Sequence, residues 1–343
     1  MRVLFLIPIL LVLLYCQGGQ TPDLDCRRLD GVPGPEDFYW DEVSKELFVS
    51  SHNRRQMESL GGIAKVLWSA ETGFGKLEWI GKPYPPDFRP HGISYTTILG
   101  IPTLFVISHS NREGALHTIE VFEKSKNGIW KHKETITDPL LTSPNDIFAT
   151  ESGEIWISND RGTGGSFRAN WDILIGHARA DIVYYSNGKF QKLGEEVVLG
   201  NGIHVQKTKD GQVLLRAVYG EKRVKVYKIQ KKQDGTVHLD YWKSIAVDGG
   251  PDNLLEDTKG HLWLAVHPST FGFVLHASGL KSSSPSKVYW IDNSTYEPKL
   301  FLETDGKPIG ALSTALGTGK RLLLSQVFED FVLDCKGEGL IWP

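Results

Sequence analysis

Carboxylate and carboxamide side chains recur at well-separated points of this 343-residue chain, several of them as adjacent pairs. The recurring residues are Glu36-Asp37, Asn145-Asp146, Asn201 and Asp252-Asn253. Taken alone, such a pair more often forms a β-turn than a functional site. Gathered in one place, the carboxylates would raise one another's pKa and the amide oxygens would lack donors, unless a cation neutralised them. These residue types therefore indicate a metal site if the fold brings them together.

An all-oxygen ligand set indicates a hard cation, and Ca²⁺ prefers roughly six to eight oxygen donors. The first candidate set comprises Glu36, Asn145, Asn201, Asp252 and Asn253. Asp37 and Asp146 directly follow their partners and should project into a neighbouring layer, where a backbone carbonyl near Ile93 could complete a second site. No zinc-like cluster of Cys and His is apparent in the sequence, which argues against a softer metal.

The elements that would gather these residues form a sequence repeat. A polar pair, an apolar residue, a turn and an apolar strand follow one another six times, 51 to 57 residues apart. The repeats begin at Glu36, His91, Asn145, Asn201, Asp252 and Ile309. A propeller blade of four antiparallel strands needs about 40 to 50 residues, so the repeat predicts an all-β, six-bladed propeller. A β-sandwich is the alternative, but it gives no reason for so long a period.

In a propeller, equal points of successive repeats converge on one central channel. Four of the six repeats would place oxygen-bearing pairs there, and the other two would place His91-Gly92 and Ile309-Gly310. Helices should be rare, with the best candidate at residues 169–179. We expect residues 21–343 to form a single propeller domain.

The N-terminus has the features of a secretory signal. Arg2 precedes an apolar run from Val3 to Tyr15 that is too short to span a bilayer. We expect residues 1–20 to be removed and the chain to be secreted, or periplasmic in a bacterium. A buried first strand, a lipid-modified Cys16 and a retained anchor are the alternatives, and only the retained segment would bring membrane or lipoprotein association. Asn293 lies in an Asn-Ser-Thr sequon, a glycosylation acceptor if the source is eukaryotic.

Cys26 and Cys335 remain after the signal, one at each end of the mature chain. Two lone cysteines usually pair in an oxidising compartment, and a closed toroid would bring the two ends together. Two buried free thiols are the alternative. The 38 basic and 41 acidic residues create no basic field, so no nucleic-acid partner is expected.

Seven short motifs follow one another in a specific order. They are PGPEDF, RPHGIS, FVISHS, SPNDIF, NGI, PDNL and LLLSQVF with a later DC. This ordered set resembles the paraoxonase/arylesterase family from about Cys26 to Cys335, although NGI and PDN also occur in related propellers. The chain departs from the family at 162–169, which reads GTGGSFRA, and in its tail after Cys335.

The resemblance implies a six-bladed propeller that holds two calcium ions in its tunnel and joins its ends by a disulfide. The catalytic ion would be held by Glu36, Asn145, Asn201, Asp252 and Asn253, and the structural ion by Asp37, Asp146 and the carbonyl of Ile93. His91 in RPHGIS and His109 in VISHS match the family's histidine dyad. Members hydrolyse lactones, and many also hydrolyse aryl esters and some organophosphates, so a small lactone or ester is the expected substrate.

The base of such a reaction stays open between His91 relayed by His109 and the metal-adjacent Asp252. His267 occupies a comparable point of a later repeat and would line the same cavity. No Gly-x-Ser-x-Gly motif is present, which argues against a serine esterase. The alternatives are a non-catalytic calcium-stabilised binding propeller and a propeller like gluconolactonase or strictosidine synthase.

Overall fold

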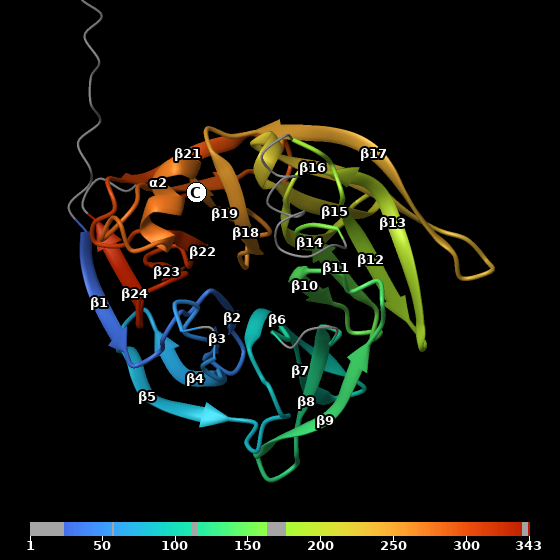
Figure 1. The fold of residues 1–343 in the computed structure, drawn as a ribbon, viewed down its shortest axis with the longest axis horizontal. Coiled ribbons are helices and arrows are strands. Elements are labelled where there is room, and N and C mark those ends of the chain that lie inside the picture. Colours follow the sequence, from blue (N-terminus) through green and yellow to red (C-terminus); the bar gives the residue numbers. More distant parts are fainter. Residues whose placement is uncertain (1–23, 57, 112–114, 163–175, 338–341) are drawn as a thin grey trace, which may run out of the picture.

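Short strands rich in apolar residues pair into six four-stranded antiparallel sheets. The computed structural model describes residues 24–56, 58–111, 115–162, 176–337 and 342–343. The sheets stand as blades around a central axis, with the first strand of each blade nearest the centre (Figure 1). The prediction of a six-bladed β-propeller is confirmed.

The first three blades run from the innermost to the outermost strand in chain order. Blade 1 contains β2 (Asp37–Asp41), β3 (Glu46–Ser51), β4 (Gly62–Ser69) and β5 (Gly73–Ile80). Blade 2 contains β6 (Pro90–Ile98), β7 (Ile101–Ser108), β8 (Thr118–Lys124) and β9 (Trp130–Thr137). Blade 3 contains β10 (Pro144–Ala149), β11 (Ile155–Asn159), β12 (Ala180–Ser186) and β13 (Lys189–Val197).

Blades 4 and 5 follow the same order, and blade 6 combines the two ends of the chain. Blade 4 contains β14 (Gly200–Thr208), β15 (Gly211–Val218), β16 (Arg223–Lys231) and β17 (Val237–Ala246). Blade 5 contains β18 (Gly250–Glu256), β19 (Leu262–His267), β20 (Ser286–Ile291) and β21 (Pro298–Thr304). Blade 6 contains β22 (Leu312–Gly317), β23 (Leu322–Gln326), β24 (Phe331–Gly337) and β1 (Leu24–Asp30).

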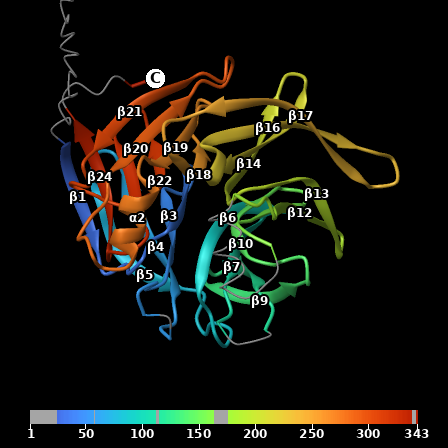
Figure 2. The same cartoon turned by 45° about the horizontal axis from the view of Figure 1, so that its top comes forward.

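The N-terminal strand closes the ring. β1 pairs antiparallel with β24, and Figures 1 and 2 show the blue strand lying beside the red one. Cys26 stands opposite Cys335 in this pairing, and a disulfide joins the two residues. The predicted bond between the chain ends is therefore confirmed. It ties together strands that are 309 residues apart in sequence.

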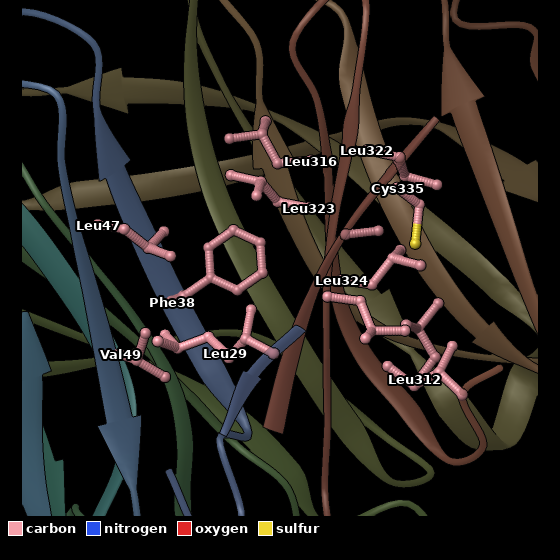
Figure 3. Packing of buried hydrophobic residues seen from close by; sticks show 14 of the residues in the cluster. Leu29, Phe38, Leu47, Val49, Leu312, Leu316, Leu322, Leu323, Leu324 and Cys335 are labelled. Carbon is pink, nitrogen blue, oxygen red and sulfur yellow. The ribbon is translucent and has the colours of Figure 1, made fainter. Parts of the chain in front are cut away.

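The core lies between neighbouring blades, because each sheet buries both of its faces. Figure 3 shows this at the junction of blades 1 and 6, where Phe38, Leu47 and Val49 face a group of leucines from β22 and β23. The run Leu322–Leu324 is buried at every position rather than at alternate ones. A strand that is buried on both faces requires this continuous apolar pattern.

Five of the six innermost strands share an irregularity near the channel. In β6, β10, β14, β18 and β22 the pairing register shifts close to the first residues of the strand. A β-bulge turns side chains away from the regular alternation. The polar pairs predicted from the sequence fall on these bulges in β6, β10, β14 and β18.

The predicted start of the sixth repeat, at Ile309, is wrong. Ile309 lies in the apolar core rather than in the channel, and the bulge of β22 falls at Ser313, four residues further on. The reason is that blade 5 combines a helix-containing connection between β19 and β20 with a seven-residue connection before β22, so Ser313 follows Asp252 by 61 residues instead of 51 to 57.

The helices also differ from the prediction. Of the expected helix at 169–179, residues 169–175 lie outside the described residues, and 176–179 form a turn and irregular backbone. A helix that the sequence did not indicate, α2 (Thr270–Ala277), follows β19, and the Ser269 side chain caps it by accepting a hydrogen bond from Gly272 N at 3.0 Å. A single 3₁₀ turn, η1 (Tyr219–Glu221), follows β15.

Several predicted features lie partly or wholly outside the described residues. The predicted signal at 1–20 lies outside the described residues, and within the described ranges no helix is long and apolar enough to cross a membrane. Residues 163–169 of the GTGGSFRA segment and 338–341 of the tail are also outside them. Beyond that gap Trp342 packs against Phe301, with ring centroids 5.0 Å apart, so the end of the chain contacts blade 5.

Candidate metal and active site

The starts of the innermost strands gather oxygen-bearing side chains in the channel. We call Glu36, Asn145, Asn201, Asp252 and Asn253 the outer layer. Asn253 Nδ2 donates to Glu36 Oε1 at 3.1 Å across the boundary between distant repeats. Asn201 donates a hydrogen bond to the Asp252 carboxylate. Asp252 and Asn253 are 4% and 1% exposed, so this polar group is buried.

Four oxygens of the outer layer have no hydrogen-bond partner among the described residues. They are Glu36 Oε2, Asn145 Oδ1, Asn201 Oδ1 and Asn253 Oδ1. A buried acceptor left unpaired costs about 1 to 3 kcal/mol, and native proteins rarely leave several of them together. These are side chains that the sequence assigned to the first calcium ion, and the donor set fits a hard cation.

The outer layer is rich in amides. In the described part of the chain no three His, Cys, Asp or Glu side chains are arranged to hold a metal. The outer layer instead combines two carboxylates with three carboxamides. Such a set suits a cation that accepts neutral oxygen ligands, as Ca²⁺ does, and not one that selects thiolate or imidazole.

Burial raises the pKa values of the two carboxylates in the outer layer. Loss of solvent raises the pKa of Glu36, although the Arg54 guanidinium and the Asn253 hydrogen bond partly oppose this. Loss of solvent also raises the pKa of Asp252 well above its ordinary value, and the nearby Glu36 charge adds to the effect. Two buried carboxylates of this kind need a positive charge between them.

Asp37 and Asp146 form a second layer, which we call the inner layer. Asp37 Oδ2 accepts from Ile93 N at 2.9 Å, and Asp146 Oδ2 accepts from Ile203 N at 2.7 Å. Burial raises the pKa of Asp146 to about 8. Burial, followed by the Asp146 charge, raises the pKa of Asp37 well above its ordinary value. Ile93 thus contacts the inner layer through its N–H group, and the role of its carbonyl as a calcium ligand stays a prediction.

Glycines allow the inner carboxylates to approach the neighbouring strands. A Cβ added to Gly92 would lie 2.7 Å from Asn145 O and 2.8 Å from Asp146 Cα. A Cβ added to Gly202 would lie 2.7 Å from Asp252 O. The His-Gly and Asn-Gly pairs of the sequence thus alternate with the acidic pairs because only glycine leaves room for the next innermost strand.

Two histidines lie beside the outer layer. His91 is the second residue of β6, and His109 follows β7 of the same blade, with the two rings stacked at 4.6 Å between centroids and 11° between planes. His91 Nε2 is 3.6 Å from Glu36 Oε1 and 3.3 Å from Asn145 Nδ2. His109 Nε2 lies 2.6 Å from Pro144 O. The structure therefore brings together the two histidines that the resemblance paired.

Both rings are held neutral. Burial, reinforced by the Arg54 charge, lowers the pKa of His91 well below its ordinary value. Burial lowers the pKa of His109 to about 3. A third ring, His117, stands 4.9 Å from His109 between centroids. The sequence gave no signal for His117, because no motif surrounds it.

Arg54 is a functional neighbour that sequence reasoning missed. It follows β3 in a polar stretch that is typical of a surface loop, yet its side chain is only 15% exposed. Its Nη1 donates to Gly34 O at 2.9 Å, and its Nη2 lies 3.3 Å from His91 Nδ1. Nη2 is also 3.8 Å from Glu36 Oε2, so Arg54 places a fixed positive charge beside the outer layer.

His267 lies at the opposite side of the outer layer from the His91 pair. Its Nε2 is 3.5 Å from Asp252 Oδ2 and 2.8 Å from Leu312 O. Phe273 of α2 stacks on the ring with centroids 4.4 Å apart. The expectation that His267 approaches the channel residues therefore agrees with the geometry, although backbone contact and stacking fix its position.

The sixth blade contributes hydroxyls instead of the predicted Ile309-Gly310 pair. Ser313 and Thr314 both donate to Glu36 O, and Thr314 Oγ1 lies 3.1 Å from Asp37 Oδ1. These side chains hold Glu36 and Asp37 in place. A repeat alignment that allowed for a longer fifth repeat would have found them.

Comparisons with known proteins agree with this fold. The arylesterase family model matches residues 70–335. Serum paraoxonase/arylesterase 1 of Mus musculus is 28% identical over 265 residues, which cover 76% of this chain and 72% of the relative. The human protein of the same name is 28% identical over 249 residues, covering 71% of this chain and 67% of the relative.

Solved structures show the same fold at lower identity. A gluconolactonase from Xanthomonas campestris superimposes with a TM-score of 0.55 at 16% identity, covering 91% of this chain and 90% of that one. A second structure, described as a putative gluconolactonase, gives a TM-score of 0.54 at 16% identity and covers 92% of both chains. The family match spans most of the propeller and all of the site beyond blade 1. The chain belongs to the arylesterase family.

Proposed function

We propose that this chain is a calcium-dependent hydrolase of lactones and aryl esters. One observation carries the proposal: four unpaired buried oxygens of the outer layer lie beside a stacked pair of neutral histidines. The relatives that are named arylesterases support the same class of reaction. A binding propeller without turnover would have no need for titratable rings next to its metal ligands.

The outer layer would hold the catalytic calcium ion, and Asp37, Asp146 and the carbonyl of Ile93 would hold a structural one. Calcium, when bound, polarises an ester carbonyl and stabilises the oxyanion that forms from it. The protein side chains would position the ligands and handle the proton. Asn253 positions Glu36 through its amide hydrogen bond, and Ser313 and Thr314 fix the backbone of Glu36.

The histidines would handle the proton of the attacking water. His91 would act as the base, since its ring lies beside Glu36 and Asn145 of the outer layer. His109 would take it onward at Nδ1, because its Nε2 donates to Pro144 O and the other nitrogen keeps a lone pair. Asp252 remains the alternative base, since its carboxylate lies within the outer layer itself.

The test is hydrolysis of γ- and δ-lactones and phenyl acetate with calcium, after chelation, and after calcium is restored. We expect activity to vanish on chelation and to return with calcium. His91→Gln should lower kcat about 100-fold or more if the ring is the base. His238→Gln, on exposed outer strand β17, is the matched control. Activity that survives complete calcium removal contradicts the proposal.

The base is assigned by comparing His91→Gln, His109→Gln and Asp252→Asn at saturating calcium. A loss confined to the two histidine variants supports the relay. A loss confined to Asp252→Asn, in protein shown to hold its calcium, assigns the base to Asp252. No turnover by folded, calcium-loaded wild-type protein on any of these substrates would indicate a binding propeller instead.

We also propose export of the chain and glycosylation of Asn293. The joined Cys26 and Cys335 support an oxidising compartment. Asn293 is exposed between β20 and β21, where a glycan would meet solvent. Mass spectrometry of the secreted protein from a eukaryotic host should find a mature N-terminus near residue 21 and a glycan on Asn293, and finding the full N-terminus would contradict the first part.

A further inference from the structure

A cavity of about 450 Å³ occupies the channel beyond the inner layer. Its lining includes Asp37 and Asp146 together with residues further along the innermost strands, such as Phe148, Val205 and Leu254. None of the outer layer lines it. The innermost strands run away from the outer layer. The cavity therefore opens toward the end of the channel opposite His91 and His109.

On the other side of Asp37 and Asp146, hydrogen bonds link residues of the outer layer across the channel. Asn253 Nδ2 reaches Glu36 Oε1 at 3.1 Å and Thr314 Oγ1 at 3.1 Å. His91 Nε2 reaches Asn145 Nδ2 at 3.3 Å on the neighbouring blades. An ion seated in the outer layer would fill the remaining gap. The inner layer is then reached more easily from the cavity than from the mouth that holds the histidines.

The cavity is large enough and acidic enough to admit a hydrated cation. At roughly 30 Å³ per water molecule, its volume exceeds that of an ion with its first hydration shell. Asp41, Glu42, Glu256 and Asp257 are among its lining residues, together with the inner pair. Lys207 and His204 also line it, but His204 Nε2 is already 2.7 Å from Glu256 Oε2. A cleft with excess negative charge concentrates cations and speeds their entry.

We propose that this cavity is a divalent-cation vestibule, through which the inner layer takes up and releases its ion independently of the mouth that admits substrate. The proposal rests on the calcium sites of the proposed function. It gives the two layers separate routes, so that an ion can leave the outer layer while the inner ion stays in place.

Terbium(III) is a suitable probe, because it replaces Ca²⁺ and is excited through nearby aromatic rings. Tyr39 and Trp40 line the cavity. To obstruct the vestibule, we would place a thiol at Lys207→Cys, on the exposed part of the lining, and attach a bulky maleimide. Lys209→Cys, which is exposed and does not line the cavity, is the matched control. The introduced thiol is then the one to label in exported protein, since Cys26 and Cys335 are bonded to each other.

The measurement is the release of terbium after rapid mixing with a chelator, together with the number of ions bound before mixing. We expect two bound ions in every variant and two release phases. The label on Lys207→Cys should slow one phase severalfold and leave the other unchanged, whereas the label on Lys209→Cys should change neither. Glu42→Lys should slow terbium entry in the same phase at low salt, and less so at high salt.

Three results overturn the proposal. Equal slowing of both phases by the Lys207→Cys label would mean a common route. Two bound ions with unchanged release rates would mean that the inner ion does not use the cavity. A stoichiometry of one ion would remove the inner ion altogether, yet calcium-dependent ester hydrolysis by the same protein would still stand, so failure of the vestibule and failure of the proposed function are told apart.

Discussion

The outer layer is held by hydrogen bonds that leave particular oxygens free. Asn253 uses its amide nitrogen on Glu36 and Thr314, which leaves Oδ1 without a partner among the described residues. Arg54 then sets the charge balance, because its guanidinium lies 3.8 Å from Glu36 Oε2. The charge of Arg54 opposes a cation bound to the same carboxylate.

Replacing Arg54 by methionine should therefore tighten calcium binding about tenfold or more, because a like charge a few ångströms from the ion is removed. The same change should lower stability by about 1 to 3 kcal/mol, since Gly34 O and Pro90 O lose a buried donor. Calorimetric titration of chelated protein measures the affinity, and Arg54→Lys, which keeps the charge, is the control. Weaker binding by Arg54→Met, similar to Glu36→Gln, would contradict this role.

Neutral buried histidines give the protein a defined acid sensitivity. Burial lowers the pKa of His52 to about 4, so between about pH 6.5 and 4 the unfolded chain binds more protons than the folded one. Stability should fall as the pH drops through that range and should not depend on His52 above it. Urea unfolding of wild type and His52→Gln at pH 7 and pH 5 should show a smaller loss in the variant, and equal losses would contradict the assignment.

The innermost strand is the element that turns a sequence repeat into a site. The bulge near the start of the strand directs side chains toward the channel. Where the second residue of the repeated pair is glycine, the neighbouring innermost strand can pack close to the backbone. Gly92 and Gly202 are the clearest cases of close approach.

Gly92→Ala and Gly202→Ala should each lower the free energy of unfolding by about 1 to 3 kcal/mol, because the added Cβ meets backbone atoms of the next blade. Both should also weaken calcium binding by displacing Asn145-Asp146 or Asp252-Asn253. Gly75→Ala is the control, since the Cβ would meet its nearest atom, Leu67 O, at 3.3 Å on an outer strand. Urea midpoints for Gly92→Ala and Gly75→Ala that coincide would contradict the close-approach argument.

Most of the innermost strands could be predicted from the sequence, because their residue pattern and their spacing repeat along the chain. The polar pairs at Asn145, Asn201 and Asp252 lie near the starts of innermost strands, as the repeat predicted. The sixth repeat does not, because a fixed spacing cannot account for the longer connections of blade 5. Arg54 could not be found either, since its role depends on backbone carbonyls that only the folded chain brings near it. The short helix α2 depends on its Ser269 cap and on contacts of Phe273 with His267 rather than on a periodic pattern.

The whole molecule is a ring, and a ring must be closed at one junction. Blade 6 closes it by pairing the first described strand with the last, and the Cys26–Cys335 disulfide fixes that pairing. Opening this junction would expose the leucine-rich contact between blades 1 and 6 (Figure 3). The site is affected too, because Ser313 and Thr314 reach Glu36 across the same junction.

Replacing both cysteines by serine should lower stability by about 2 to 5 kcal/mol, because the bond closes a very long loop in the unfolded chain. The urea midpoint measures the loss, and wild-type protein treated with reductant should approach the variant. Calcium affinity should fall as well, through the loosened Glu36. A variant with the wild-type midpoint would show that strand pairing alone closes the ring.

The central claim is that the outer layer binds the calcium ion on which hydrolysis depends. The most direct measurement titrates calcium into chelated protein while recording bound ion and lactone hydrolysis in the same sample, for wild type and Asn201→Ala. We predict that hydrolysis follows occupancy of one site and that Asn201→Ala shifts both curves together to higher calcium. Hydrolysis that is complete before this site fills, or an Asn201→Ala variant that loses the ion and keeps full activity, would contradict the account.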